Sequence, residues 1–299
     1  MKNHKWLNGP DAPEKDILPP IKAAVILCLV FYAIEIPMVL FNIFPNKTVL
    51  YTADFVIRCG IGTIALVLLS RFYKQSGDPE GFKNQFRGKI SWKVWLLLCP
   101  LIIYILLPLL KILAGTFRTA VLGLFCINAL QQVATGYFEE SVYRGLVMKG
   151  LMVYRRDTLK HRIITVLISG GIFGLSHLPN IVFGENPLVQ VPTTMLIGIF
   201  WAAIYMCTGN LTLLMALHAL TDLTPRIVGY LFGFESEPAV SSFIFGARDV
   251  IDYAVFPIVS IIICVFYDKI KNPEKAETVI SGAERGGEGE GRQSAWQAR

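Results

Sequence analysis

Nine ionisable side chains interrupt apolar stretches of this sequence: Glu35, Asp54, Arg58, Glu139, Glu140, Arg144, His177, His218 and Asp222. On membrane-insertion scales, a charged residue at the centre of an apolar helix costs about 3 kcal/mol. Proteins keep such residues where they pair with one another or serve a function. These positions are therefore the first place to look for chemistry.

Two adjacent glutamates open the first cluster. The segment EESVYR, at 139–144, places Glu140 and Arg144 four residues apart on one helical face, which predicts an ion pair between them. Glu139 lies on the neighbouring face and has no cation in its own helix. We therefore expect one glutamate to be held by the arginine and the other to be free to react.

Two of the four histidines lie in comparable surroundings. The segment FGLSH places His177 one turn after Phe173, and the segment HALTD places His218 and Asp222 one turn apart on one face. Three small residues precede His177: Gly170, Gly171 and Gly174. Such residues predict close approach to another helix.

These residue types suit hydrolysis. A carboxylate beside an imidazole can deprotonate water, and a second imidazole can donate a hydrogen bond to a developing oxyanion. The sequence offers no Ser, Cys or Lys nucleophile with a base beside it. Glu139, His177 and His218 could instead hold a zinc ion with an open position for water. The sequence leaves both mechanisms open, and zinc is the one cofactor that it suggests.

Each group also has a structural explanation. A buried histidine often satisfies a core hydrogen bond, and Asp54 and Arg58, four residues apart, can neutralise each other without a further role. Glu35 has no partner nearby in the sequence. The clusters near 139, 177 and 218 nevertheless favour one shared site, because separate burials would each need a partner that the sequence does not supply. We expect Glu139, Glu140, His177, His218 and Asp222 to converge on one cavity, where burial and like-charge contact perturb pKa values.

The elements that must position these groups are membrane spans. Apolar residues make up 54% of the chain, charged residues 17%, and the mean hydropathy is +0.52. A span needs about 20 apolar residues. Eight stretches qualify or nearly do: 21–43, 49–70, 92–113, 120–153, 163–179, 189–207, 211–232 and 252–267. The predicted fold is an all-α polytopic transmembrane bundle over 21–268, with a cytoplasmic segment at 1–20 and a disordered tail at 269–299.

The basic residues alternate between successive loops. They gather in the N-terminal segment, the second and fourth loops and after the last span, whereas the first, third and fifth loops hold few. Under the positive-inside rule this pattern predicts that both termini are cytoplasmic. It also accounts for the net charge of +6 without a nucleic-acid partner. The expected surroundings are the lipid bilayer.

The depth of the first cluster sets a condition on its helix. If the fourth span ended at Glu140, that residue would lie at the membrane edge, about 24 Å from His177 along the membrane normal. The two could not share a water molecule. We therefore expect the helix to continue through the apolar residues up to Val153.

In order and spacing, the three clusters resemble the signature of the CPBP intramembrane proteases: EExxxR, FxxxH, and HxxxN or HxxxD. This family includes CAAX prenyl endopeptidases and bacterial bacteriocin-processing and immunity proteins. The resemblance covers 139–222 and implies a multispanning helical protease. It implies that Glu139 is the general base and that His177 helps to hold the water.

The same resemblance places His218 and position 222 on the oxyanion side, with Glu140 and Arg144 as supporting structure. Prenyl-protein proteases carry Asn where this chain has Asp222, and an ionised carboxylate cannot donate to an oxyanion. Three alternatives then remain for Asp222: it orients His218, it is protonated, or it favours a metal.

The first functional hypothesis is a CPBP-type intramembrane endopeptidase, metal-dependent in the zinc alternative, that cuts a peptide or protein substrate reaching the membrane. The second is a non-catalytic membrane protein, namely a transporter, a pseudo-protease or an immunity factor, that uses the same buried groups for binding or proton relay. Convergence of a base, a water site and an oxyanion donor distinguishes the two.

Overall fold

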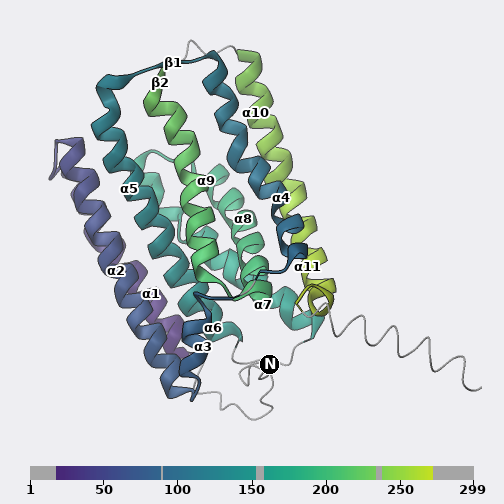
Figure 1. The fold of residues 1–299 in the computed structure, drawn as a ribbon. Coiled ribbons are helices and arrows are strands. Elements are labelled where there is room, and N and C mark those ends of the chain that lie inside the picture. The colour runs from purple at the N-terminus through teal and green to yellow at the C-terminus, as the bar shows by residue number, and fades with distance from the viewer. Residues whose placement is uncertain (1–17, 89, 153–157, 234–237, 272–299) are drawn as a thin grey trace, which may run out of the picture.

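A computed structural model describes residues 18–88, 90–152, 158–233 and 238–271. It is a bundle of helices that run roughly side by side, with short connections at both ends (Figure 1). Eight helical segments are long and apolar enough to cross a membrane: Pro19–Leu40, Lys47–Gln75, Trp92–Leu113, Thr119–Met152, Leu159–Phe183, Pro187–Thr208, Leu211–Leu231 and Phe243–Ile270. The predicted all-α architecture and the number of spans are confirmed. Each span lies within a few residues of its predicted position except the last, which begins nine residues earlier.

Several spans are built from more than one helical element. In chain order the described elements are α1 (Leu18–Leu40), α2 (Lys47–Gln75), α3 (Pro79–Asn84), α4 (Trp92–Leu106), η3 (Leu107–Ala114), β1 (Thr116–Phe117), η4 (Thr119–Val121), α5 (Leu122–Glu139), η5 (Glu140–Val147), α6 (Met148–Met152), α7 (Leu159–Leu175), η6 (Leu178–Phe183), α8 (Pro187–Thr208), α9 (Leu211–Leu231), β2 (Phe232–Gly233), α10 (Pro238–Val250), η7 (Ile251–Val255) and α11 (Phe256–Lys271). The two short strands pair antiparallel, Thr116 opposite Gly233, and join the ends of two spans.

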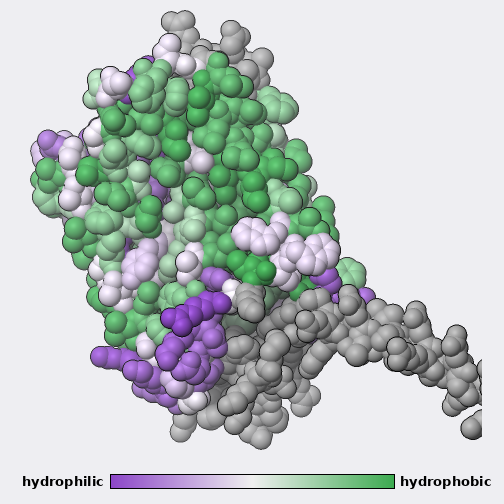
Figure 2. All heavy atoms as spheres, in the orientation of Figure 1, coloured by the Kyte–Doolittle hydropathy of each residue, from purple (hydrophilic) through white to green (hydrophobic). Residues whose placement is uncertain are grey.

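The outer surface of the bundle is apolar. Green, hydrophobic side chains cover most of the face shown in Figure 2, and hydrophilic side chains gather at the end that carries α3. Large apolar residues such as Leu29, Val56 and Ile103 are more than 50% exposed. Such a surface is unfavourable in water and suits contact with lipid tails.

Asparagine side chains begin three of the spans. The Oδ1 atoms of Asn46, Asn186 and Asn210 accept hydrogen bonds from backbone N–H groups in the first turns of α2, α8 and α9. Each satisfies a donor that has no partner within its own helix. Gly209, at a φ of 56°, ends α8 and reverses the chain into α9.

The fourth span continues past the glutamate pair, as expected, although the predicted end at Val153 lies outside the described residues. From Glu140 to Val147 the helix is a π-helix, and α6 carries it to Met152. A π-helix is rare and is frequently found at functional sites. Glu139 and Glu140 therefore lie inside the bundle, at the point where the helix widens.

Close helix contacts set the positions of the three clusters. A Cβ atom added at Gly136 of α5 would lie 2.7 Å from the Met215 carbonyl oxygen of α9, and one at Gly170 of α7 would lie 2.6 Å from the Ile199 nitrogen of α8. One at Gly174 would lie 2.9 Å from the Met195 Cα. The prediction of close approach is thus confirmed for Gly170 and Gly174. It is wrong for Gly171, which faces open space because it points away from α8.

The predicted segment boundaries extend beyond the described part of the chain. Residues 1–17 and 272–299, which make up most of the predicted cytoplasmic segment and tail, lie outside it. Within it, α11 continues to Lys271, three residues past the predicted end of the membrane domain.

Candidate active site

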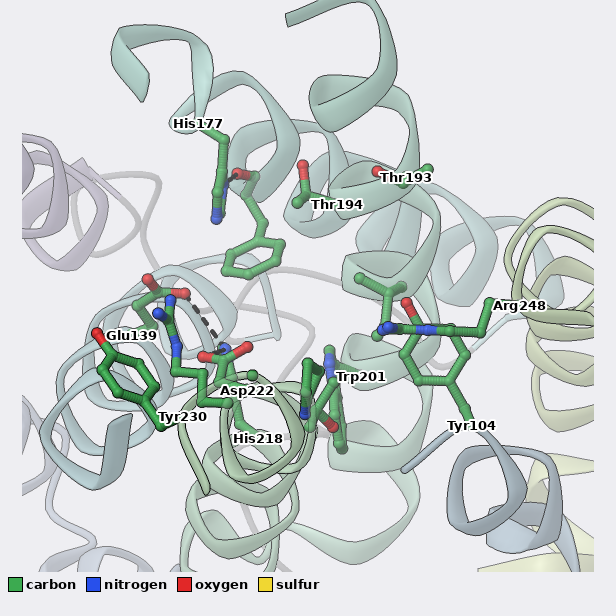
Figure 3. Close-up of a pocket in the computed structure, with 16 residues that line it drawn as sticks. Tyr104, Glu139, His177, Thr193, Thr194, Trp201, His218, Asp222, Tyr230 and Arg248 are labelled. Carbon is green, nitrogen blue, oxygen red and sulfur yellow. Dashed lines mark hydrogen bonds and ion pairs between the residues drawn. The ribbon is translucent and has the colours of Figure 1, made fainter. Parts of the chain in front are cut away.

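A cavity of about 590 Å³ lies between the helices and brings the predicted clusters together (Figure 3). Glu139, His177, His218 and Asp222 all lie on its wall. Glu140, also predicted to lie there, does not line the cavity, because its side chain is fully buried against Arg144 and His218. The remaining lining residues are Tyr104, Phe173, Thr193, Thr194, Ile197, Trp201, Thr221, Pro225, Arg226, Gly229, Tyr230 and Arg248. Among the described residues, none that lines the cavity is a Ser, Cys or Lys.

His218 is held at the base of this cavity by Glu140. Its Nδ1 atom donates a hydrogen bond of 2.7 Å to Glu140 Oε1, and its ring stacks on Trp201 with an interplanar angle of 10°. The opposite nitrogen, Nε2, lies 3.5 Å from Glu139 Oε2 and 3.6 Å from Asp222 Oδ2. The Nδ1 partner fixes the orientation of the ring, so that Nε2 is the atom offered to the cavity.

The Glu140–Arg144 ion pair that the sequence predicts is confirmed. Arg144 Nη1 lies 2.9 Å from Glu140 Oε1, and neither side chain is exposed to solvent. The guanidinium also donates through Nη2 to the Gly198 carbonyl of α8, at 3.2 Å, and lies 4.5 Å from the centre of the Phe173 ring. Arg144 therefore links the π-helix to α7 and α8. Arg144 also holds Glu140, which in turn holds His218 through a hydrogen bond.

His177 follows the last turn of α7. Its Nδ1 atom lies 2.7 Å from the Phe173 carbonyl oxygen, which can only accept, so Nδ1 is the donor. Nε2 then remains for the cavity, and Figure 3 shows the ring pointing toward the space between Glu139 and Asp222. The phenylalanine of this cluster has a packing role, because its ring contacts those of His177, Tyr143 and His218.

Glu139 has less contact with protein than its neighbour. Its Oε2 atom is buried and accepts no hydrogen bond from the described residues. Its Oε1 atom lies 4.0 Å from Arg58 Nη1 of α2. The expectation that Glu139 lacks a cation in its own helix holds, but a cation from another helix approaches it.

Arg58 and its partners depart from the prediction of a self-contained pair. Arg58 bonds Asp54 through Nε at 2.9 Å, and its Nη2 atom lies 2.9 Å from Glu35 Oε1. Glu35 thus has the partner that its sequence neighbourhood lacks. The contact joins residues 23 positions apart, so only the packing of α1 on α2 creates it.

The predicted zinc set gains no support from this arrangement. Among the described residues, no group of three His, Cys, Asp or Glu side chains is placed to hold a metal ion. Zinc binding by Glu139, His177 and His218 stays a prediction, and no step below is derived through a metal.

Residues 121–224 match a family model described as Type II CAAX prenyl endopeptidase Rce1-like. All three motifs, from Glu139 to Asp222, fall within the match. This stretch is similar to an Rce1-like domain. No curated protein and no solved structure gave a match.

The Rce1-like stretch contains most of the cavity wall but not all of it. Tyr104 of α4, Arg248 of α10 and the last turns of α9, with Arg226 and Tyr230, complete the wall from outside the matched residues. None of these residues is among those predicted from the sequence. Arg226 and Tyr230 had a usable signal, since they continue the four-residue spacing of His218 and Asp222 along one face of α9. For Tyr104 and Arg248 the sequence holds no such signal.

Proposed function

We propose that this protein is an intramembrane endopeptidase in which Glu139 activates a water molecule. The observation that carries the proposal is the buried Glu139 Oε2 atom, 3.5 Å from His218 Nε2, in a cavity that His177 also lines. A carboxylate oxygen without a protein donor can accept the proton of a water. In the part of the cavity wall that the structure describes, no Ser, Cys or Lys is found, which favours water as the nucleophile.

The proposed reaction has two steps. In the first, Glu139 takes a proton from a water that His177 Nε2 helps to hold, and the water oxygen bonds to the carbonyl carbon of the peptide. The carbonyl oxygen becomes an oxyanion beside His218 Nε2. In the second, Glu139 gives its proton to the peptide nitrogen, the carbon–nitrogen bond breaks, and an acid and an amine leave.

The oxyanion step sets a requirement on His218. Because Nδ1 donates to Glu140, Nε2 can donate to an oxyanion only from the doubly protonated ring. Glu139, Glu140 and Asp222 all lie within 3.6 Å of that ring. We assign Asp222 to this group of carboxylates, whose negative charge balances the positive charge of the doubly protonated His218 ring. This role does not require a hydrogen bond from Asp222 to the oxyanion.

The proposed substrate is a peptide segment that enters the bilayer from a membrane-associated protein. The Rce1-like description makes a prenylated C-terminal segment the first candidate. Phe173, Ile197 and Trp201 give the cavity an apolar side that suits such a segment.

The test is cleavage by the purified full-length protein in liposomes. Fluorescence-quenched peptides would be supplied in pairs that differ only in prenylation, and the same sample would be assayed for bound metal and for inhibition by a chelator. We expect turnover by the wild type and a large loss in Glu139→Gln. If no peptide is cut, the result favours a non-catalytic binder or relay, which is the second hypothesis. If Glu139→Gln cuts as fast as the wild type, the protein is a peptidase in which Glu139 is not the base.

A further inference from the structure

Arg58 lies outside the three motifs and outside the Rce1-like stretch, yet three carboxylates surround it. Asp54 and Glu35 each lie 2.9 Å from a guanidinium nitrogen, and Glu139 lies at 4.0 Å. The three acids come from different spans: α2, α1 and α5. One largely buried cation therefore joins a base proposed for catalysis to two acids that do not line the cavity.

The surroundings of Arg58 fix it in place. Its side chain is 12% exposed, and its guanidinium lies 4.7 Å from the centre of the Phe31 ring. Phe31 in turn contacts Phe138, the residue before Glu139, with ring centres 4.8 Å apart. Asp54 also accepts a hydrogen bond from Gln131 of α5. The cation is thus anchored to the same helix that carries Glu139.

The nitrogens of Arg58 are divided between two kinds of contact. Nε and Nη2 make short hydrogen bonds to Asp54 and Glu35, whereas Nη1 faces Glu139 at a distance too long for one. Arg58 approaches Oε1, whereas Oε2 is the atom proposed to take the proton. Attraction across 4.0 Å holds the carboxylate through its charge and leaves Oε2 available.

We propose that Arg58 is a positioning residue for Glu139, with Asp54 and Glu35 holding its guanidinium at a distance that orients the base without bonding it. The inference rests on the proposed function for its consequence in catalysis. The contact itself can be tested without catalysis.

The principal variant neutralises the whole network: Glu35→Gln, Asp54→Asn and Arg58→Met together. Arg58→Met alone would leave two buried carboxylates unpaired and could prevent folding, whereas the triple variant removes both signs of charge. Arg162→Met with Asp268→Asn is the matched control. Arg162 is also buried, bonds an acid at 2.9 Å and lies 4.3 Å from the centre of an aromatic ring, but it does not line the cavity.

In the peptide assay we expect the triple variant to lose roughly 10²-fold in kcat, with KM within about threefold of the wild type, because a misplaced base affects the transition state more than binding. The control should keep its kcat. A triple variant with the kcat of the wild type overturns the inference and leaves the proposed function intact.

Thermal unfolding tests the contact between Arg58 and Glu139 independently of turnover. Glu139→Gln would be introduced into the wild type and into the triple variant. The change in Tm that it causes would then be compared between these two backgrounds. If Arg58 supports Glu139, the two changes differ by about 2 °C or more, since only the wild type supplies a cation. Equal Tm changes in the two backgrounds overturn the inference. This result stands even if no peptide is ever cleaved, so the two proposals fail separately.

Discussion

Glu139 and Glu140 are neighbours in the chain, but their environments differ because successive residues of a helix point in directions about 100° apart. Glu140 points into the protein core and is bonded there by Arg144 and His218. Glu139 points into the cavity, where its side chain is 13% exposed. The Glu140 carboxylate is thus held by contacts inside the protein, whereas the Glu139 carboxylate is accessible to a substrate.

For Glu139→Gln we expect a kcat lower by roughly 10²–10⁴, the usual effect of removing a general base. The shape of the side chain is retained, so Tm should change by only a few degrees. Peptide cleavage and thermal unfolding of the same preparation measure both quantities. An active Glu139→Gln enzyme would falsify the mechanism.

Glu140→Gln should behave differently, because it leaves Arg144 buried without a counter-charge. Breaking a buried pair in this way costs on the order of 3 kcal/mol. We expect a clear fall in Tm together with a loss of activity, since His218 also loses the carboxylate that orients it. If this variant proves as stable as Glu139→Gln, the division of roles between the two glutamates is wrong.

Asp222→Asn tests the assignment of Asp222 as a counter-charge. Asp222 is 32% exposed and 3.6 Å from His218, so its attraction to the imidazolium is screened. We expect kcat to fall by about fivefold or less, because two other carboxylates remain. A variant faster than the wild type would instead favour an amide donor at the oxyanion, and would contradict the assignment.

At the scale of elements, the site depends on helices that approach closely at glycines. Gly136 brings α5 against α9, so that Glu139 and Glu140 meet His218. Gly170 and Gly174 bring α7 against α8, and the backbone of α8 then accepts a hydrogen bond from Arg144. The π-helix at 140–147 contacts both α7 and α9.

Gly170→Ala and Gly171→Ala form a matched pair in α7. The new Cβ at 170 would meet backbone of α8 at 2.6 Å, whereas the one at 171 meets nothing within 4 Å. We expect Gly170→Ala to destabilise by about 1–3 kcal/mol through overpacking, and Gly171→Ala to be neutral or stabilising because alanine is the better helix former. Tm values of the two variants provide the comparison, and similar values would show that the α7–α8 contact is not tight.

At the scale of the whole molecule, eight crossings place the beginning of α1 and the end of α11 at the same end of the bundle (Figure 1). The cavity extends from Glu139 toward the other end, since its lining includes Tyr230 in the last turn of α9, next to β2. The two ends of the bundle are therefore not equivalent for a substrate.

The distribution of Lys and Arg predicts that both termini are cytoplasmic, which is tested by reporter fusions at each end. We expect cytoplasmic signals from both, which would place the β1–β2 end on the opposite side of the membrane. A signal from the opposite side at either terminus would refute this orientation.

The sequence by itself determined the elements and the residue types at the site. Hydropathy along the chain gives eight spans because the bilayer sets their length, and helical spacing gives the Glu140–Arg144 pair because both residues lie on one helix. The three motifs were sufficient for the family resemblance, which the match over residues 121–224 confirms. All of this information is local.

The tertiary structure alone decided the partners that cross between helices. In the folded protein, His218 Nδ1 forms its hydrogen bond with Glu140 rather than with Asp222, although Asp222 is the nearer of the two in the sequence. The tertiary structure also joined Arg58 to Glu35 and brought it to Glu139, 81 residues away. Such contacts depend on the rotation, depth and separation of packed helices, and changes of a few ångströms make or break them, whereas the pattern of residue types stays the same.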